Sequence, residues 1–125
     1  MNEIIKELTL YLHTMETFDK DSAQDGQALH AYLITLTNYM ARANYLMAEY
    51  KRQFKKEKAN NYLLIEKDNN LSPSILRDFI DAKSADTAFV YDLAERVSRC
   101  CVHTCDGLRT IISSLKSERT FSQYQ

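Results

Sequence analysis

The sequence predicts an all-α protein, an elongated helical bundle built on a long antiparallel helix pair with a short N-terminal helix and a short connecting helix. Glycine and proline together make only 3 of 125 residues, so the tight turns that sheets and loop-rich folds need are nearly absent. Apolar residues recur at spacings of three and four, which is the period of amphipathic helices. We expect residues 1–125 to form a single helical domain, because this length is usual for one domain.

The first helix is predicted at residues 2–18. Its apolar positions follow a 4-3-4-3 spacing: Ile4, Leu8, Tyr11, Met15 and Phe18. A polar run at 19–21 ends this helix. Ser22 and Asp25 then have the spacing of a capping box, which predicts that the next helix starts at residue 22.

The second helix is predicted at residues 22–67 and carries the strongest signal in the chain. An unbroken coiled-coil seam alternates steps of four and three through Leu29, Leu33, Leu36, Met40, Ala43, Met47, Tyr50 and Phe54. A third position of each heptad is also apolar, at Tyr32, Tyr39 and Leu46. Because the apolar stripe is this wide, it needs packing partners on two sides. A helix of this length spans roughly 60–67 Å, so the molecule is elongated or the helix is bent.

Two further helices are predicted after a break at residues 68–71. Ser72 is an N-cap and Pro73 stands at the first helical position, so a short helix follows at 73–82. The last helix is predicted at 85–119, followed by a frayed tail at 120–125. Its apolar face contains Val90, Leu93, Val97, Cys100, Thr104, Leu108, Ile111 and Leu115. An extra step of four beside Gly107 is a stutter in this seam.

The sequence favours a cytoplasmic protein with no membrane partner. An odd number of cysteines within six residues is a poor disulfide framework and favours a reducing compartment. Charged residues at positions 3, 6 and 7 are incompatible with the apolar core of a signal peptide. The longest uncharged stretch, 26–41, is too short and too polar to cross a bilayer.

Metal and cofactor chemistry finds little support in the sequence. Cys100, Cys101, His103 and Cys105 do not converge on one side of a helix, so we interpret the cysteines as packing residues and expect neither a metal nor a cofactor. Di-iron bundles need Glu-x-x-His pairs, and no glutamate here has a histidine three residues later.

Catalysis has one weak candidate. Asp78 and Asp81 lead an acidic cluster that would serve a magnesium-dependent nucleotide hydrolase. The pairs Asp92–Arg96 and Glu95–Arg99 instead indicate a solvated, ion-paired surface. We therefore predict that the protein is not an enzyme, with the hydrolase as the alternative.

Charge is distributed in alternating blocks along the chain. Residues 1–50 carry a net charge of −4, residues 51–60 carry +4, residues 61–95 carry −4 and residues 96–125 carry +3. Blocks of opposite sign can face each other in a symmetric oligomer, or the basic blocks can bind an external anionic partner.

Two sets of residues are candidates for binding. Five basic residues lie close together and are interleaved with aromatic residues, a pattern suited to nucleic acid or another anion: Lys51, Arg52, Lys55, Lys56 and Lys58. The other reading is the solvated end of a long helix. A tyrosine-rich set predicts a protein interface, with a bundle core as its alternative reading: Tyr32, Tyr39, Arg42 and Tyr45.

Residues 103–118 resemble the closing segment of small all-helical accessory proteins of tailed bacteriophages and prophages. The match has the form H-x-x-x-x-x-R-[TS]-x-x-S-x-x-K-x-E and includes Arg109, Ser113 and Lys116, to which no role is transferred. The resemblance implies a phage accessory protein in the bacterial host cytoplasm. This class includes inhibitors of host factors and defence systems that act by binding.

Together these observations predict a non-catalytic protein that forms a homo-oligomer, most simply a dimer, and binds a protein partner of the host. Exposed parts of the 22–67 seam would pair about a two-fold axis. A modulator or inhibitor of host or defence machinery is the predicted role. The alternative is a nucleic-acid or nucleotide-binding module that uses residues 51–58.

Overall fold

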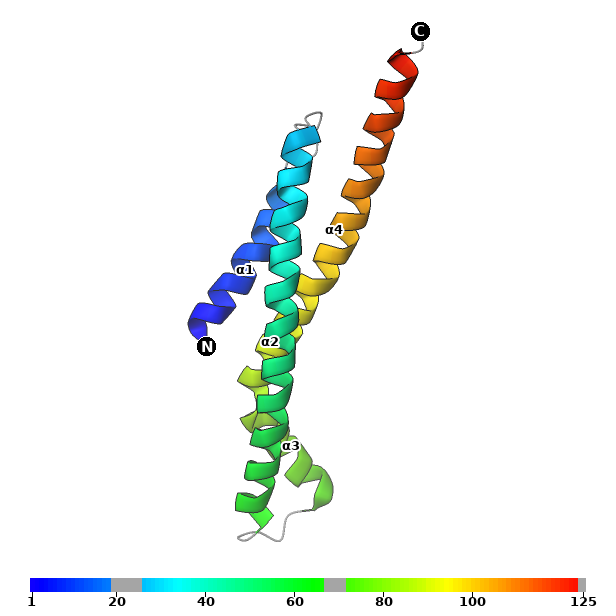
Figure 1. Ribbon diagram of the computed structural model, residues 1–125. Coiled ribbons are helices and arrows are strands. Elements are labelled where there is room, and N and C mark those ends of the chain that lie inside the picture. The colour runs from blue at the N-terminus through cyan, green and yellow to red at the C-terminus, as the bar shows by residue number, and fades with distance from the viewer. Residues whose placement is uncertain (19–25, 67–71, 124–125) are drawn as a thin grey trace.

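The computed structural model describes residues 1–18, 26–66 and 72–123, and this part of the chain forms four helices (Figure 1). These helices are α1 (Asn2–Thr17), α2 (Gly26–Glu66), α3 (Pro73–Lys83) and α4 (Ala85–Gln123). No strand occurs among the described residues, which confirms the predicted all-α class. The predicted capping box at residues 22–25 lies outside them, as does residue 67.

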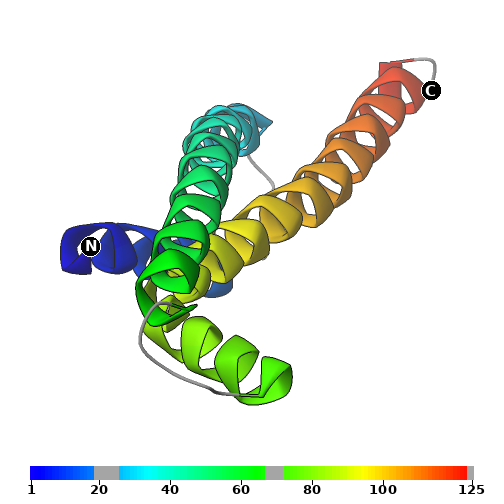
Figure 2. The same cartoon turned by 90° about the horizontal axis from the view of Figure 1, so that it is seen from below.

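The long helices α2 and α4 run antiparallel and cross each other (Figures 1 and 2). They diverge toward the start of α2, and the C-terminal end of α4 extends beyond it. α1 packs against the pair near the first half of α2, while α3 folds against its other end. α2 is one continuous helix of 41 residues, which corresponds to about 62 Å.

The core is the seam between α2 and α4. On α2 the most buried positions are Leu29, Leu36, Ala43 and Leu46, with Tyr50 and Tyr32 close behind. The other predicted seam positions, Leu33, Met40, Met47 and Phe54, are half-buried and flank this stripe. Because α4 and α1 cover the α2 seam within one chain, the predicted pairing of its exposed parts with a second copy has little seam available to it.

The buried stripe of α4 is rotated by one residue from the predicted one over part of its length. Cys101, Cys105 and Ile112 are buried, whereas the predicted Cys100, Thr104 and Ile111 are half-buried. The predicted and observed stripes differ by neighbouring residues of similar polarity, such as Ile111 and Ile112, so the sequence is compatible with both. α1 contacts the observed stripe, since the Met15 Sδ atom lies 3.7 Å from the Cys101 Sγ atom.

The predicted stutter is present but lies earlier in the helix. Two consecutive steps of four separate Val97, Cys101 and Cys105, so the stutter precedes Gly107 by about one turn.

Local signals set the ends of α3. The Ser72 hydroxyl accepts a hydrogen bond from the Ile75 backbone N–H at 3.5 Å, and Pro73 begins the helix as predicted. The Ser84 backbone N–H donates to the Ile80 carbonyl oxygen at 3.2 Å and closes the last turn of α3. The next helix starts at once with Ala85, because the Ser84 carbonyl already accepts from the Ala88 N–H.

The end of α4 corrects the predicted tail. Residues 120–123, expected to be frayed, continue the helix to Gln123. The physical reason is that residues 108–123 contain neither glycine nor proline, so nothing in the sequence interrupts the backbone hydrogen bonds there.

The seam should dominate stability. We expect Leu36→Ala to lower the free energy of unfolding by about 2–5 kcal/mol, because Leu36 is fully buried and truncation leaves a cavity. Ile34→Ala, at a neighbouring exposed position of α2, should change it by less than about 0.5 kcal/mol. Urea unfolding followed by circular dichroism measures both. Equal losses would show that the seam does not carry the fold.

Candidate functional site

The predicted anion site lies in the second half of α2. Lys51, Arg52, Lys55 and Lys56 are exposed, and Lys58 is half-buried. Lys51 and Lys55 are four residues apart, as are Arg52 and Lys56, so each pair is adjacent on the helix surface. The segment therefore presents positive charge to solvent; we call its four exposed residues the basic face.

Ion pairs occupy part of this charge. The Arg52 Nη2 atom lies 2.8 Å from Glu49 Oε1. The Lys58 Nζ atom lies 3.1 Å from Asp81 Oδ1 of α3 and also stands 5.1 Å from the centre of the Phe54 ring. Lys58 therefore ties α2 to α3.

The remaining lysines of the basic face are available to bind an anion, whereas two of the aromatic rings interleaved with them, Tyr50 and Phe54, are not available for stacking. Within the described residues, Lys51, Lys55 and Lys56 form no ion pair. Tyr50 is buried and Phe54 is half-buried, so these rings do not offer open faces to nucleic-acid bases.

A polar contact aligns α4 with α2 beside the basic face. The Thr87 hydroxyl donates to the Glu57 carboxylate, with Oγ1 at 2.9 Å from Oε1 and 2.8 Å from Oε2. Gln53 Nε2 donates to the same carboxylate at 3.2 Å. Since the helices are antiparallel, the exposed Asp86 and Asp92 of α4 stand at about the levels of residues 58 and 52 of α2.

The acidic pair proposed for magnesium chemistry is exposed on α3. Asp81 binds Lys58, and Asp78 faces solvent. Among the described residues no three or more His, Cys, Asp or Glu side chains are grouped to hold a metal ion. Both carboxylates therefore lie on a solvated surface, where Asp81 is paired with Lys58.

Two of the predicted interface residues join α1 to α2 within the chain. Tyr32 is buried and stacks on Phe18, with ring centres 3.7 Å apart, and Tyr39 stacks on Tyr11 at 4.0 Å. Burial raises the pKa of Tyr32 to about 12. Its buried hydroxyl has no hydrogen-bond partner in the described part of the chain. Tyr32 and Tyr39 therefore lie in or against the bundle core, as the alternative interpretation of this set expected.

The other two predicted interface residues face outward. Tyr45 is 60% exposed, and the Arg42 guanidinium carbon lies 5.9 Å from the centre of its ring. Arg42 also binds Glu7 of α1 through two hydrogen bonds, Nε to Oε1 at 2.9 Å and Nη2 to Oε2 at 3.3 Å. The ion pair holds Arg42 beside the tyrosine.

The Glu7 carboxylate is the acceptor at the centre of this contact. It accepts hydrogen bonds from Arg42 and from the Tyr11 hydroxyl. The hydrogen bond from Arg42 is the main reason that the pKa of Glu7 is lowered, against the opposing effect of burial. Burial, followed by the bond to Glu7, raises the pKa of Tyr11 to about 12.

The outward side of α2 forms a stripe that the sequence analysis did not single out. Five exposed residues follow a 4-3-4-3 spacing, and we call them the outer stripe: Ile34, Asn38, Ala41, Tyr45 and Ala48. Ile34 is 64% exposed. This spacing places all five on one face of the helix, opposite the core. The signal in the sequence was the helical spacing of Ile34, Ala41, Tyr45 and Ala48, which the stronger periodicity of the seam obscured.

The cysteines pack rather than assemble a reactive site. Cys101 and Cys105 are buried, and burial raises the pKa of Cys101 to about 11. A thiol with a raised pKa is less often the reactive thiolate. Cys100 is half-buried beside the core.

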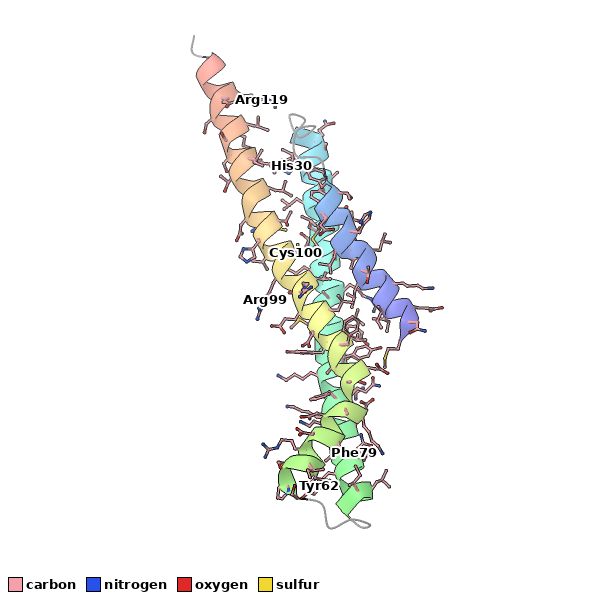
Figure 3. The ribbon with its side chains drawn as sticks, turned by 180° about the vertical axis from the view of Figure 1, so that it is seen from behind. His30, Tyr62, Phe79, Arg99, Cys100 and Arg119 are labelled. Atoms are coloured by element: carbon pink, nitrogen blue, oxygen red, sulfur yellow. The ribbon has the colours of Figure 1, made fainter. Side chains whose placement is uncertain are left out.

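A second exposed apolar group lies at the end of the molecule formed by α3 and the last turns of α2. We call it the tip surface: Tyr62, Leu63, Leu64, Ile75 and Phe79. Figure 3 labels Tyr62 and Phe79 at this end, far from the C-terminus. Ile75, Leu76, Phe79 and Ile80 recur at helical spacing in α3, which is typical of a buried face, but of these only Ile80 is buried.

The chain matches no protein-family model, and no curated protein or solved structure is significantly similar to it. None of the described helices has the length and apolar character needed to span a membrane.

The contact between Glu7 and Arg42 predicts a pH-dependent stability. A carboxyl group whose pKa is lowered by folding stabilises the fold above its ordinary pKa and ceases to do so once protonated. We expect Glu7→Gln to cost at most about 1 kcal/mol near pH 7, because the pair is partly exposed. The difference should vanish near pH 2.

Urea unfolding of both proteins across this pH range provides the measurement. Glu16→Gln is the control, because Glu16 is exposed on the same helix and makes no ion pair within the described residues. A difference between wild type and Glu7→Gln that persists unchanged at low pH would rule out the ion pair as its cause.

Proposed function

We propose that this chain is a non-catalytic accessory protein of the phage type, which self-associates and binds a protein partner in the bacterial cytoplasm. A modulator or inhibitor of host or defence machinery is the role that we propose for it. The resemblance of residues 103–118 supports the biological class, and the outer stripe of α2 supports binding as the mode of action.

The outer stripe is the observation that carries the protein-binding function. Ile34 and Tyr45 each leave most of their side chains in water, and the exposed small residues Ala41 and Ala48 lie on the same face. A partner helix can approach closely over small residues and cover the two large ones. Large apolar side chains exposed at helical spacing on one face suit a partner helix that docks by its own apolar face.

Chemistry at the edge of the stripe also suits a protein partner. Tyrosine and arginine are enriched at protein interfaces, and here Tyr45 lies beside Arg42. Because Glu7 already fixes the Arg42 side chain, less side-chain entropy remains to be lost on binding. Tyr45 and Arg42 are therefore the two predicted interface residues that we retain.

Binding should be lost when a charge is introduced into the stripe. We expect Ile34→Asp to reduce capture of the partner from a bacterial host lysate at least tenfold, because the carboxylate would be buried against an apolar surface. Immobilised protein and quantitative mass spectrometry provide the measurement. Leu64→Asp is the matched control, since Leu64 is 65% exposed on the same helix but belongs to the tip surface.

Capture that is equal for wild type, Ile34→Asp and Leu64→Asp would contradict the assignment of the outer stripe. Circular dichroism of each variant verifies that the helices still form.

Binding of nucleic acid or a nucleotide is the second candidate function. The specific observation in its favour is the set of three exposed lysines, Lys51, Lys55 and Lys56, that form no ion pair among the described residues. Such side chains are available to neutralise backbone phosphates. The buried Tyr50 and half-buried Phe54 argue against base stacking there.

Charge reversal tests this candidate. If the basic face binds nucleic acid, Lys51→Glu/Lys55→Glu/Lys56→Glu should weaken binding to a single-stranded oligonucleotide by at least about tenfold. The slope of log K against log salt should fall by about 2, since each lost phosphate contact contributes about 0.7.

Fluorescence anisotropy over a salt series provides both quantities. Arg96→Glu/Arg109→Glu/Arg119→Glu has the same net charge and serves as the control. Equal binding by the two triple variants, or no binding by the wild type, would exclude this function.

A further inference from the structure

We infer that the outer stripe and the basic face of α2 form one docking surface, and that its occupant is an acidic, amphipathic helix of a partner protein. This inference rests on the proposed function and deepens it, because it states the chemistry of the partner that the outer stripe binds. It also assigns the lysines of the basic face to that protein partner rather than to nucleic acid.

The spacing of the outer stripe continues through the second half of α2. Alternating steps of four and three residues lead from Ile34 to Tyr62, and every one of the nine positions is exposed. A helical segment of this length spans about 42 Å. We call these nine residues the extended stripe: Ile34, Asn38, Ala41, Tyr45, Ala48, Arg52, Lys55, Ala59 and Tyr62.

The extended stripe stays on the side of α2 away from the core along its whole length. Core positions recur every seven residues, and a residue of the extended stripe follows each of them by five, which is more than a third of a turn away around the helix. Both sets therefore turn around the helix axis at the same rate. The core positions are Leu29, Leu36, Ala43 and Tyr50, and the matching stripe positions are Ile34, Ala41, Ala48 and Lys55.

The other helices contact α2 on different sides. Glu57 joins it to α4, Tyr39 stacks on a ring of α1, and Lys58 pairs with a carboxylate of α3. None of these three residues belongs to the extended stripe. Within the described chain no helix covers this face, although it has the 4-3 spacing by which one helix packs on another. The spacing therefore favours a helix as the occupant.

Charge identifies the chemistry of that helix. In a pair of helices, the residues next to the contact positions form the ion pairs that select the partner. Lys51 lies next to Arg52 and Lys56 lies next to Lys55, so the second half of the face is flanked by lysine on both sides. Lys51, Lys55 and Lys56 are exposed and form no ion pair among the described residues.

α2 has no free carboxylate on this face to balance the lysines. Between residues 34 and 62 its only acidic residues are Glu49 and Glu57. Glu49 is half-buried and pairs with Arg52 at 2.8 Å, and Glu57 accepts hydrogen bonds from Thr87 of α4. Carboxylates for these lysines must therefore come from the occupant. A second copy that docked by the same face would bring none.

The two halves of the face define a matching asymmetry in the partner. Residues 34–48 of the extended stripe are uncharged and include the large exposed side chains of Ile34 and Tyr45. The lysines begin only at residue 51. The partner helix should therefore be apolar on the face that it buries, with its carboxylates concentrated in the half that lies beside residues 51–56.

The first experiment measures the binding of two synthetic peptides by fluorescence anisotropy. Both peptides have four heptads with leucine and alanine at the contact positions. They differ only at the flanking positions of two adjacent heptads, which carry glutamate in one peptide and lysine in the other. We expect the wild type to bind the glutamate peptide at least tenfold more tightly. This preference should shrink towards equality in about 1 M NaCl, because salt screens exposed charges.

The second experiment exchanges the charge on the protein. Lys51→Glu/Lys55→Glu/Lys56→Glu should reverse the preference, because its carboxylates then face the lysine peptide. Arg96→Glu/Arg109→Glu/Arg119→Glu has the same net charge on α4 and should keep the wild-type preference. Ile34→Asp should weaken the binding of both peptides at least tenfold and leave the preference between them unchanged. Circular dichroism verifies that each variant is helical.

Several results would overturn the inference. These are a wild type that binds neither peptide, equal binding of the two peptides, and equal binding of a scrambled glutamate peptide, which would show attraction by charge alone. A single-stranded oligonucleotide that displaces the glutamate peptide more effectively than the unlabelled peptide does would assign the lysines to nucleic acid. A wild-type dimer that dissociates with Ile34→Asp in sedimentation equilibrium would show that a second copy occupies the face.

The two proposals fail separately. Capture of a host protein that is lost with Ile34→Asp but unchanged by the triple lysine variant would reject the acidic helix and keep the partner-binding function. Tight binding of the glutamate peptide, with the reversed preference in the triple variant but no host protein captured, would do the reverse.

Discussion

The long α2–α4 seam is the constraint on which the rest of the structure depends. Leu29, Leu36 and Ala43 of α2 are fully buried, as are Val90 and Val97 of α4. Each helix alone would leave a continuous apolar stripe in water, and most of the stability of such a helix in a protein comes from packing this stripe. Once the two helices pack, α1 and α3 have fixed surfaces on which to fold, and the polar faces of α2 and α4 are determined.

α1 covers the part of the wide apolar stripe of α2 that α4 leaves exposed. Tyr32 and Tyr39 lie beside the main stripe and are covered by ring stacking on Phe18 and Tyr11. The Glu7–Arg42 pair closes the outer margin of this contact. As a result the tyrosine-rich set is divided, with two rings inside the chain and Tyr45 outside it. Only those residues that do not pack within the chain, such as Tyr45, are therefore available to bind a partner.

The fold was predictable from the sequence to the level of helices, because period and composition depend on local chemistry. The starts of α3 and α4 follow from Ser72, Pro73 and the break at Ser84. The face of α4 that is buried was less predictable, because Cys100 and Cys101 are neighbours in the sequence and have the same polarity. In the folded chain Cys101 is fully buried in the core, where its sulfur lies beside that of Met15, and Cys100 is half-buried. The tip surface was missed because exposure there depends on where neighbouring helices end, which single-helix periodicity does not contain, and the outer stripe was missed because the stronger seam obscured its signal.

The contact between Thr87 and Glu57 has a consequence for alignment along the helix axes. A pair of helices joined only by a heptad seam packs nearly as well after slipping by seven residues, a shift of about 10.5 Å. Slippage here would separate the buried Thr87 hydroxyl from its carboxylate acceptor. A buried polar group without a partner costs roughly 1–3 kcal/mol. The apolar seam alone would allow several alignments of α2 with α4 that bury similar apolar surface. The hydrogen bonds from the Thr87 hydroxyl to the two Glu57 carboxylate oxygens favour one of them.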